Sequence, residues 1–322
     1  MSPPDRQDAY AAAREGSVVA LLPERGVLAV TGPRRKKFLH DILSQDIDGR
    51  AAGEGSLAAL MDVKGRLLAL MRALVTTDEV LLEMPADRLD VVEQAFIHYR
   101  VAAPVRFAVR PTAVVAVLGP EARNVLAAAG LAVGDLPLQG HQSGRIAGWE
   151  ARVQRAGDLP ARGFAVHVAP EGAAAVEQAL RSAGAAPVTR ETLDTLRVEE
   201  GRPWYGPDVT DENLLHETGL VPEYHSATKG CYVGQEVIAR LEARGGHVNK
   251  RLRGLRLGAP AVAGAPVTAG GKDVGRVTTA AVSPRLGPIA MGYVHRNQGD
   301  PGTLVEVGGH SAVVVALPMV PS

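Results

Sequence analysis

The sequence predicts an α+β protein made of two related strand-and-helix units followed by a small β-barrel. Two observations indicate the related units: a strand, Gly-Pro, helix pattern occurs twice, and strand-like stretches precede a VEQA helix in each copy. A third observation indicates the barrel (a sandwich is the alternative). From Lys250 onward short apolar stretches alternate with Gly- and Pro-rich turns, and no helix-length periodic segment appears.

In the first copy, GVLAV predicts a strand and Thr31-Gly32-Pro33 leads into a helix whose apolar residues share one face. The strand-like stretches GSLAALMDVKGRLLALMRALV and DEVLLEM precede the helix VVEQAF. In the second copy, VVAVLGPEARNVLAA repeats the pattern, and the stretches GWEARVQRAG and GFAVHVA precede AVEQAL. The prolines are offset by 120 − 33 = 87 residues and the glutamates by 177 − 93 = 84, which indicates a duplication; chance similarity in an Ala/Val-rich chain is the alternative.

The length of 322 residues exceeds what one hydrophobic core usually organises, so several domains are expected. We expect residues 1–110 to form the first unit, completed by residues 190–249, which carry Cys231. Residues 111–189 would form the second unit and residues 250–322 the barrel.

Composition excludes several classes of protein. Lys+Arg and Asp+Glu both number 35, so no global charge directs the chain to nucleic acid or to an anionic membrane. The single cysteine cannot form an internal disulfide, which indicates a reducing compartment. The start, MSPPDRQDAYAAAREG, lacks the apolar core of a signal peptide, and no apolar run approaches ~20 residues. We therefore expect a cytoplasmic protein without a membrane span.

The stretch TRETLDTLRVEEGRP predicts a helix that is capped by Thr189 and stops at Gly201. Glu199 and Glu200 then occupy its last turn, where the helix dipole disfavours anions by ~0.3–1 kcal/mol each. A buried carboxylate that accepts two parallel hydrogen bonds from a ligand would compensate for this cost. The alternative is that both acids are solvated and pair with Arg197 or Arg202.

The stretch TKGCYVGQE holds the only cysteine, Cys231, just before a predicted helix that opens after Gly234. The helix start and nearby Lys229 both favour a thiolate, which could act as a nucleophile or bind a soft metal. Gly230 and Gly234 leave room for a ligand near the backbone. The alternative is a buried cysteine that acts as a small hydrophobe. The surrounding histidines match no zinc-ligand spacing, so no metal site is predicted.

The octapeptide KGCYVGQE resembles the signature of the YgfZ family, folate-binding proteins related to the glycine-cleavage T-protein (aminomethyltransferase). The resemblance covers nearly the whole chain. Further stretches that are similar to this superfamily are GVLAVTGP, FLHDILSQDI, LRVEEGRP, YGPD, HETGL, SPRLGPIAMGYVHR and ALPMV.

This resemblance implies a three-domain ring whose central cavity binds tetrahydrofolate, and a role in assembling or maintaining iron-sulfur clusters. Family glutamates matching Glu199 contact the pterin, and a tyrosine matching Tyr205 lies in the folate site. The resemblance thus implies catalytic candidates Cys231 and Lys229, and cofactor-binding candidates Glu199, Arg197, Tyr205, Tyr232, Gly234, Gln235 and Glu236.

One departure concerns the mechanism. T-proteins place an aspartate that assists methylene transfer shortly after a glycine pair, but Leu68 and Ala69 occupy the matching positions here, and Asp62 is the nearest acid. The sequence therefore favours a folate-binding accessory factor for iron-sulfur client proteins, with a folate-dependent one-carbon (aminomethyl) transferase as the alternative. YgfZ-type proteins are associated with cluster-dependent RNA-modifying enzymes, such as those of tRNA modification. The basic run 34–37 could itself contact RNA but is more typical of a solvated helix start.

Overall fold

The structure is a computed structural model that describes residues 6–320. Residues 1–5, which belong to the N-terminal segment where no signal peptide is expected, lie outside the described residues, as do residues 321–322. Over residues 6–320, no helix combines the length and the apolar character that a membrane crossing requires. The chain forms two compact units. Unit 1 comprises the chain up to Val188 together with Pro222–Gln235, and unit 2 comprises Thr189–Val221 and the chain from Glu236 onward.

The first sheet of unit 1 is antiparallel, with the strand order β3-β4-β5-β2-β6. Apolar side chains of α2 and α3 pack on one face of it and form a core with β2, β4 and β5. Its elements are β2 (Arg25–Thr31), α2 (Arg35–Ile42), β3 (Gly55–Met61), β4 (Leu67–Val75), β5 (Glu79–Pro85), the 3-10 turn η1 (Ala86–Arg88), α3 (Leu89–Arg100) and β6 (Arg106–Arg110).

The second sheet of unit 1 has the order β11-β1-β7-β10-β9-β8. A separate core lies between this sheet and the helices α4 and α5. Its elements are α1 (Arg6–Glu15), β1 (Val18–Leu21), β7 (Ala113–Leu118), α4 (Ala122–Ala128), β8 (His141–Ile146), β9 (Trp149–Arg155), β10 (Phe164–Val168), the 3-10 turn η2 (Pro170–Gly172), α5 (Ala173–Ser182) and β11 (Ala186–Pro187).

The two sheets confirm the predicted duplication. If β2 to β6 are matched with β7 to β11 in chain order, both sheets have the same arrangement, except that β1 is inserted between β7 and β11. Each copy also turns from strand to helix at a glycine with positive φ, namely Gly32 (109°) and Gly119 (104°). An Ala/Val-rich composition does not explain why both halves have a similar order of elements along the chain and the same order of strands in the sheet.

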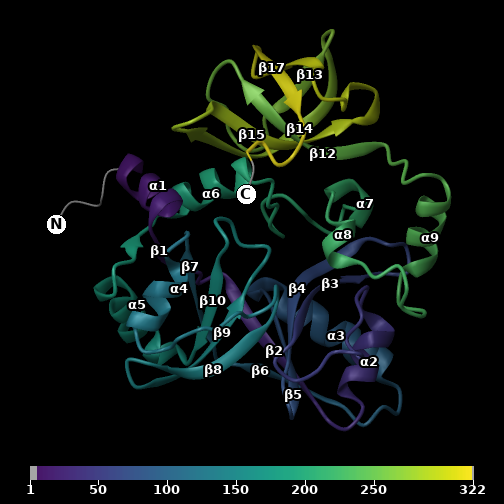
Figure 1. The fold of residues 1–322 in the computed structure, drawn as a ribbon. Coiled ribbons are helices and arrows are strands. Elements are labelled where there is room, and N and C mark those ends of the chain that lie inside the picture. The colour runs from purple at the N-terminus through teal and green to yellow at the C-terminus, as the bar shows by residue number, and fades with distance from the viewer. Residues whose placement is uncertain (1–5, 321–322) are drawn as a thin grey trace. The chain divides into compact units, whose positions relative to one another are not determined.

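The sheets of unit 1 face each other with their helices outside. Figure 1 shows α2 and α3 beside the first sheet, and α4 and α5 beside the second. Side-chain hydrogen bonds cross the layer between the sheets, for example from His167 on β10 to Glu83 on β5 at 2.7 Å. This layer is therefore polar, whereas each sheet packs apolar residues against its own helices.

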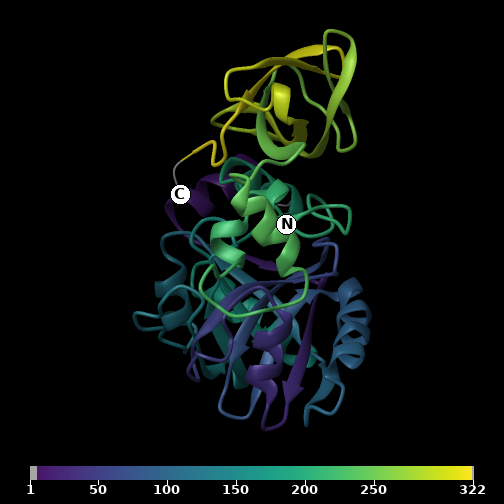
Figure 2. The same ribbon diagram turned by 90° about the vertical axis from the view of Figure 1, so that its right-hand side faces the viewer.

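Unit 2 contains the closed barrel β12-β15-β14-β13-β16-β17, which confirms the predicted barrel (yellow-green to yellow in Figure 2). The helix α6 packs against β14 and β15. The elements of this part of the chain are α6 (Arg190–Glu199), α7 (Leu215–Thr218), α8 (Val221–Tyr224), α9 (Gln235–Ala243), β12 (Lys250–Leu257), β13 (Pro266–Ala269), β14 (Lys272–Ser283), β15 (Gly287–His295), η3 (Arg296–Gln298), β16 (Leu304–Val307) and β17 (His310–Val315).

Candidate functional site

The carboxylate of Glu199 is buried at the end of α6. The helix begins as predicted, because the Thr189 hydroxyl accepts a hydrogen bond from the Thr192 backbone N–H at 3.3 Å. It ends at Glu199, and Glu200 follows as the C-cap residue. Their exposed fractions are only 0% and 5%, so the alternative that both acids are solvated is wrong.

Hydrogen bonds hold the last turn of α6 in place within unit 2. Ser283, the last residue of β14, donates its hydroxyl to the Glu199 carboxylate. The Glu199 carbonyl accepts the backbone N–H groups of Met319 at 2.8 Å and Val320 at 3.2 Å. A buried carboxylate is costly unless donors surround it, and the negative end of the helix dipole adds to that cost. The position therefore favours a group that brings N–H or O–H donors.

Arg197 is buried in the same last turn of α6 and binds acceptors of unit 2. Its Nε donates to Asp194 Oδ1 at 2.6 Å, its Nη2 donates to Thr279 Oγ1 at 2.7 Å, and its Nη1 donates to Asp208. Both charges are desolvated in the Arg197–Asp208 pair, so the geometry of that pair must be held closely. Arg197 therefore positions the segment around Asp208.

The segment that contains Tyr205 is folded by the same aspartate. Asp208 Oδ2 accepts the Trp204 backbone N–H at 3.0 Å, and the Asp208 N–H donates to the Trp204 carbonyl at 3.0 Å. Tyr205, between them in sequence, is buried. No role was predicted for Asp208, Thr279 or Ser283. Asp208 and Ser283 lie in the stretches YGPD and SPRLGP, whose resemblance to the superfamily could have indicated them.

The motif segment around Cys231 belongs to unit 1. Cys231 is exposed, so the alternative of a buried hydrophobe is wrong. The next residue, Tyr232, is buried, and its ring lies 5.8 Å from the ring of His225 and 4.8 Å from the Lys229 Nζ. The thiol therefore lies on the surface of unit 1, directly beside an anchored side chain.

Gly234 lets this segment lie directly against the turn between β3 and β4. Its φ is +83°, and a Cβ atom there would lie 2.7 Å from the carbonyl oxygen of Asp62 and 3.1 Å from the Cβ of Met61. Any other residue would have to move the backbone as well as adopt an unfavourable conformation. The glycine therefore fixes the segment that follows the thiol.

Lys229 connects the segment to α2. Its ammonium donates to the carbonyls of His40 and Leu43, the latter at 2.5 Å, and Leu43 is the C-cap residue of α2. A cation is favourable at this end of a helix. Burial lowers the pKa of Lys229 to about 8, although the charges of Asp41 and Asp46 act in the opposite direction. Lys229 thus anchors the motif, and its activation of Cys231 stays a prediction.

The remaining candidates lie at the start of α9, which begins at Gln235 as predicted. Gln235 is partly buried and Glu236 is exposed. The structure thus gathers the sequence-predicted residues into two groups, one in each unit. Unit 1 holds Lys229, Cys231, Tyr232, Gly234 and Gln235, and unit 2 holds Glu199, Arg197, Tyr205 and Glu236.

The positions that match the transferase aspartate are apolar in the structure too. Ala69 is buried in the first core and Leu68 packs against that core. Asp62 Oδ1 accepts the backbone N–H groups of Lys64 at 2.8 Å and Arg66 at 2.9 Å. The nearest acid in sequence therefore closes the turn between β3 and β4, and this hydrogen bonding gives it a structural role.

Comparison with known proteins identifies the family. The sequence matches the GCVT N-terminal domain over residues 7–222 and the glycine cleavage T-protein C-terminal barrel domain over residues 250–320. The chain belongs to the glycine cleavage T-protein family. Another T-protein-like fold is seen in the crystal structure of glycine cleavage system aminomethyltransferase T from Bartonella henselae. That structure matches with a TM-score of 0.88 at 22% identity, covering 98% of this chain and 89% of that one.

Relatives of this T-protein family member include proteins named as transferases. It is 28% identical over 308 residues to "Putative transferase At1g60990, chloroplastic" of Arabidopsis thaliana, covering 94% of this chain and 70% of the relative. It is 32% identical over 333 residues to an aminomethyltransferase of Streptomyces avermitilis, covering 97% and 88%. The predicted α+β T-protein fold with a C-terminal barrel is therefore confirmed.

Proposed function

We propose that this T-protein family member is a tetrahydrofolate-binding accessory factor for iron-sulfur cluster assembly or maintenance, similar to the YgfZ family, with Cys231 as its functional thiol. The octapeptide KGCYVGQE and the family membership support this proposal. The observation that carries it is the buried carboxylate of Glu199, oriented by Ser283 at the end of α6. The client proteins and the cytoplasmic location stay predictions.

Glu199 would hold the pterin. A carboxylate has two oxygens with about four acceptor positions, so it can bind several donors at once, with Ser283 and the parallel N–H groups of a planar ring edge among them. Its surroundings suit this role because a desolvated acceptor rewards a ligand that brings donors. Arg197 would act indirectly, since it holds Asp208 and the segment with Tyr205. When bound, tetrahydrofolate supplies one-carbon carrying capacity.

Tetrahydrofolate binding by purified protein tests the assignment of Glu199. The Glu199→Gln variant should bind roughly 10- to 150-fold more weakly, because a hydrogen bond to a charged group contributes about 1.5–3 kcal/mol. Isothermal titration calorimetry measures the change. The matched control is Glu191→Gln, which removes the same charge from an exposed position of α6 and should bind like the wild type. Equal affinities of Glu199→Gln and wild type would refute the assignment.

Complementation tests the role of the thiol. In cells that lack the native factor, Cys231→Ala should fail to restore the activity of cluster-dependent enzymes under oxygen, because the nucleophilic or metal-binding sulfur is gone. Because Cys231 is exposed, its replacement by alanine should not impair folding. Equal soluble levels of the variant and the wild-type protein would verify this. Full rescue by Cys231→Ala would leave the thiol without a role.

The second candidate function is a folate-dependent one-carbon transferase. The family and the names of the relatives favour it. Leu68 and Ala69 oppose it, because neither can transfer a proton where T-proteins carry an aspartate. Folate-dependent release of formaldehyde or methylenetetrahydrofolate from an amine substrate would establish this alternative.

A further inference from the structure

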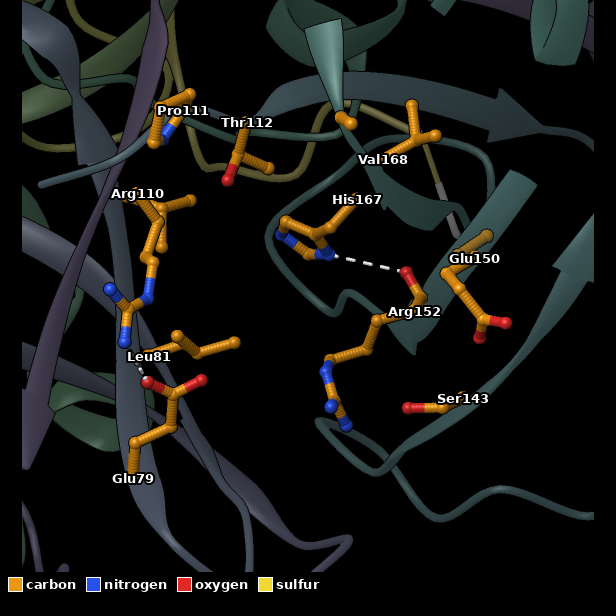
Figure 3. Close-up of a pocket in the computed structure, with 13 residues that line it drawn as sticks. Glu79, Leu81, Arg110, Pro111, Thr112, Ser143, Glu150, Arg152, His167 and Val168 are labelled. Carbon is orange, nitrogen blue, oxygen red and sulfur yellow. Dashed lines mark hydrogen bonds and ion pairs between the residues drawn. The ribbon is translucent and has the colours of Figure 1, made fainter. Parts of the chain in front are cut away.

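A pocket of about 340 Å³ opens between the two sheets of unit 1 and is lined by none of the candidate folate-binding and cysteine-motif residues. Figure 3 shows its two sides. Glu79, Leu81 and Arg110 line it from β5 and β6, and Ser143 and Arg152 line it from β8 and β9. The volume is within the range of small-molecule sites. The pocket lies wholly within unit 1.

The polar wall of the pocket is a row of side chains in register across three strands. Ser143 on β8 pairs with Arg152 on β9, and Arg152 pairs with His167 on β10. Directly paired residues of neighbouring strands place their side chains on the same face of a sheet. The row therefore presents a hydroxyl, a guanidinium and an imidazole on the face that lines the pocket, as Figure 3 shows.

His141 holds the guanidinium of Arg152 in place. The His141 Nε2 lies 3.0 Å from the Val75 carbonyl oxygen, which can only accept, so Nε2 carries a hydrogen. Burial, assisted by the charge of Arg152, lowers the pKa of His141 to about 4. The neutral ring therefore uses its Nδ1 lone pair to accept a hydrogen bond from Arg152 Nη1 at 3.0 Å. This leaves further guanidinium N–H groups available for the pocket.

The charge of Arg152 lacks a partner carboxylate. Within the chain from residue 6 to residue 320, no acid lies within 4.0 Å of its guanidinium nitrogens. The two acids of the pocket pair elsewhere: Glu79 with Arg110 at 2.9 Å and Glu150 with Arg145 at 2.7 Å. Burial lowers the pKa of Arg152, although the charge of Glu79 acts in the opposite direction. A half-buried cation held by a neutral ring carries an electrostatic cost that a bound anion would relieve.

We propose that this pocket binds a small organic acid, with the carboxylate on Arg152 and Ser143 and an apolar body against Leu81 and Pro111. The apolar lining supplies burial for the body of the ligand. The carboxylates of Glu79 and Glu150 at the same pocket disfavour a doubly charged anion, so a singly charged acid fits better than a phosphate. The proposal is independent of folate binding, because it concerns other residues.

Benzoate is a suitable probe, since it joins one carboxylate to an apolar ring. Ligand-detected NMR titration of the full chain measures its Kd beside those of neutral benzamide and inorganic phosphate. Arg152→Gln should weaken benzoate binding roughly 10- to 150-fold, the range for a lost charged hydrogen bond. The control Arg100→Gln removes an exposed charge from the end of α3, which does not line the pocket, and should leave the Kd unchanged.

Benzoate binding that exceeds benzamide and phosphate binding, and that depends on Arg152 but not on Arg100, supports the proposal. Equal binding of benzamide, tighter binding of phosphate, or unchanged benzoate binding by Arg152→Gln overturns it. Circular dichroism verifies folding of each variant. If Arg152→Gln does not fold, Arg152→Lys provides the test, because a point charge without the planar fork should still weaken carboxylate binding.

Discussion

Two arginines at the two ends of the polar layer in unit 1, one buried and one half-buried, have opposite kinds of partner. At one end, Arg72 is almost fully buried and donates to Glu83 at 2.7 and 2.9 Å and to Asp158 at 2.7 Å. Arg25 and His167 also contact Glu83, each at 2.7 Å, so two carboxylates balance two guanidinium groups. At the other end, Arg152 rests on a neutral histidine beside a pocket.

The difference separates a structural role from a binding role. Arg72 and Glu83 are paired residues of β4 and β5 in the first sheet, and their hydrogen bonds with Asp158 and His167 connect this pair to the second half of unit 1. Arg72 and Arg25 hold the pKa of Glu83 well below its usual range despite burial. Arg152, in contrast, is held in position by the fold but has no carboxylate partner, so a bound anion can supply the neutralising charge. The comparison can be tested on stability and on pH.

The largest expected effect is on folding stability. Arg72→Met should lower the free energy of unfolding by about 3–5 kcal/mol, because it leaves buried Glu83 and Asp158 without their shared partner. Arg152→Met, the matched change at the open end, should cost less than about 1 kcal/mol, because no carboxylate loses a partner. Urea unfolding followed by circular dichroism measures both. Similar losses for the two variants would remove the distinction between the ends.

A smaller effect is expected on the pH dependence of stability. The pKa of His141 is lowered from 6.5 to about 4 in the folded chain, so its stabilising effect is complete above about pH 6.5 and is lost as the pH falls towards 4. The loss should be on the order of 1–3 kcal/mol. Glutamine at this position can keep both hydrogen bonds but cannot titrate.

The difference between the unfolding free energies of wild type and His141→Gln isolates this effect, because other groups titrate equally in both. The difference should change steadily between pH 6.5 and 4 in favour of the variant. A difference that stays constant over this range would show that His141 remains as easily protonated as in the unfolded chain, and that Arg152 has a different support.

Much of the fold could be predicted because local signals were strong. Thr189 and Gly201 bounded α6, the two Gly-Pro turns marked the duplication, and alternating apolar stretches after Lys250 indicated the barrel. The position of β1 could not be predicted. Its sequence, VVAL, fits any strand, and its pairing with β7 and β11 depends on contacts far along the chain.

The site was predicted less completely, because burial of charged residues is a tertiary property. Glu199 was singled out by its position at a helix end, but the donor that holds it, Ser283, is 84 residues away. The polar alternation of β9, with Arg152 and Gln154 on one face, is typical of a solvent-facing surface, yet that face meets the other sheet. The charges of Arg72 and Glu83 inside apolar strands were a signal that could have indicated the ionic cluster.

The insertion of β1 affects the order in which the chain can fold during synthesis. Residues 18–21 leave the ribosome well before their hydrogen-bonding partners, residues 115–118 and 186–187. The intervening first sheet, residues 25–110, contains all of its own strands and can form before the partners of β1 have been synthesised. The second sheet is therefore complete only when β1, made before the first sheet, pairs with strands made after it, so the two halves cannot mature as separate, successive modules.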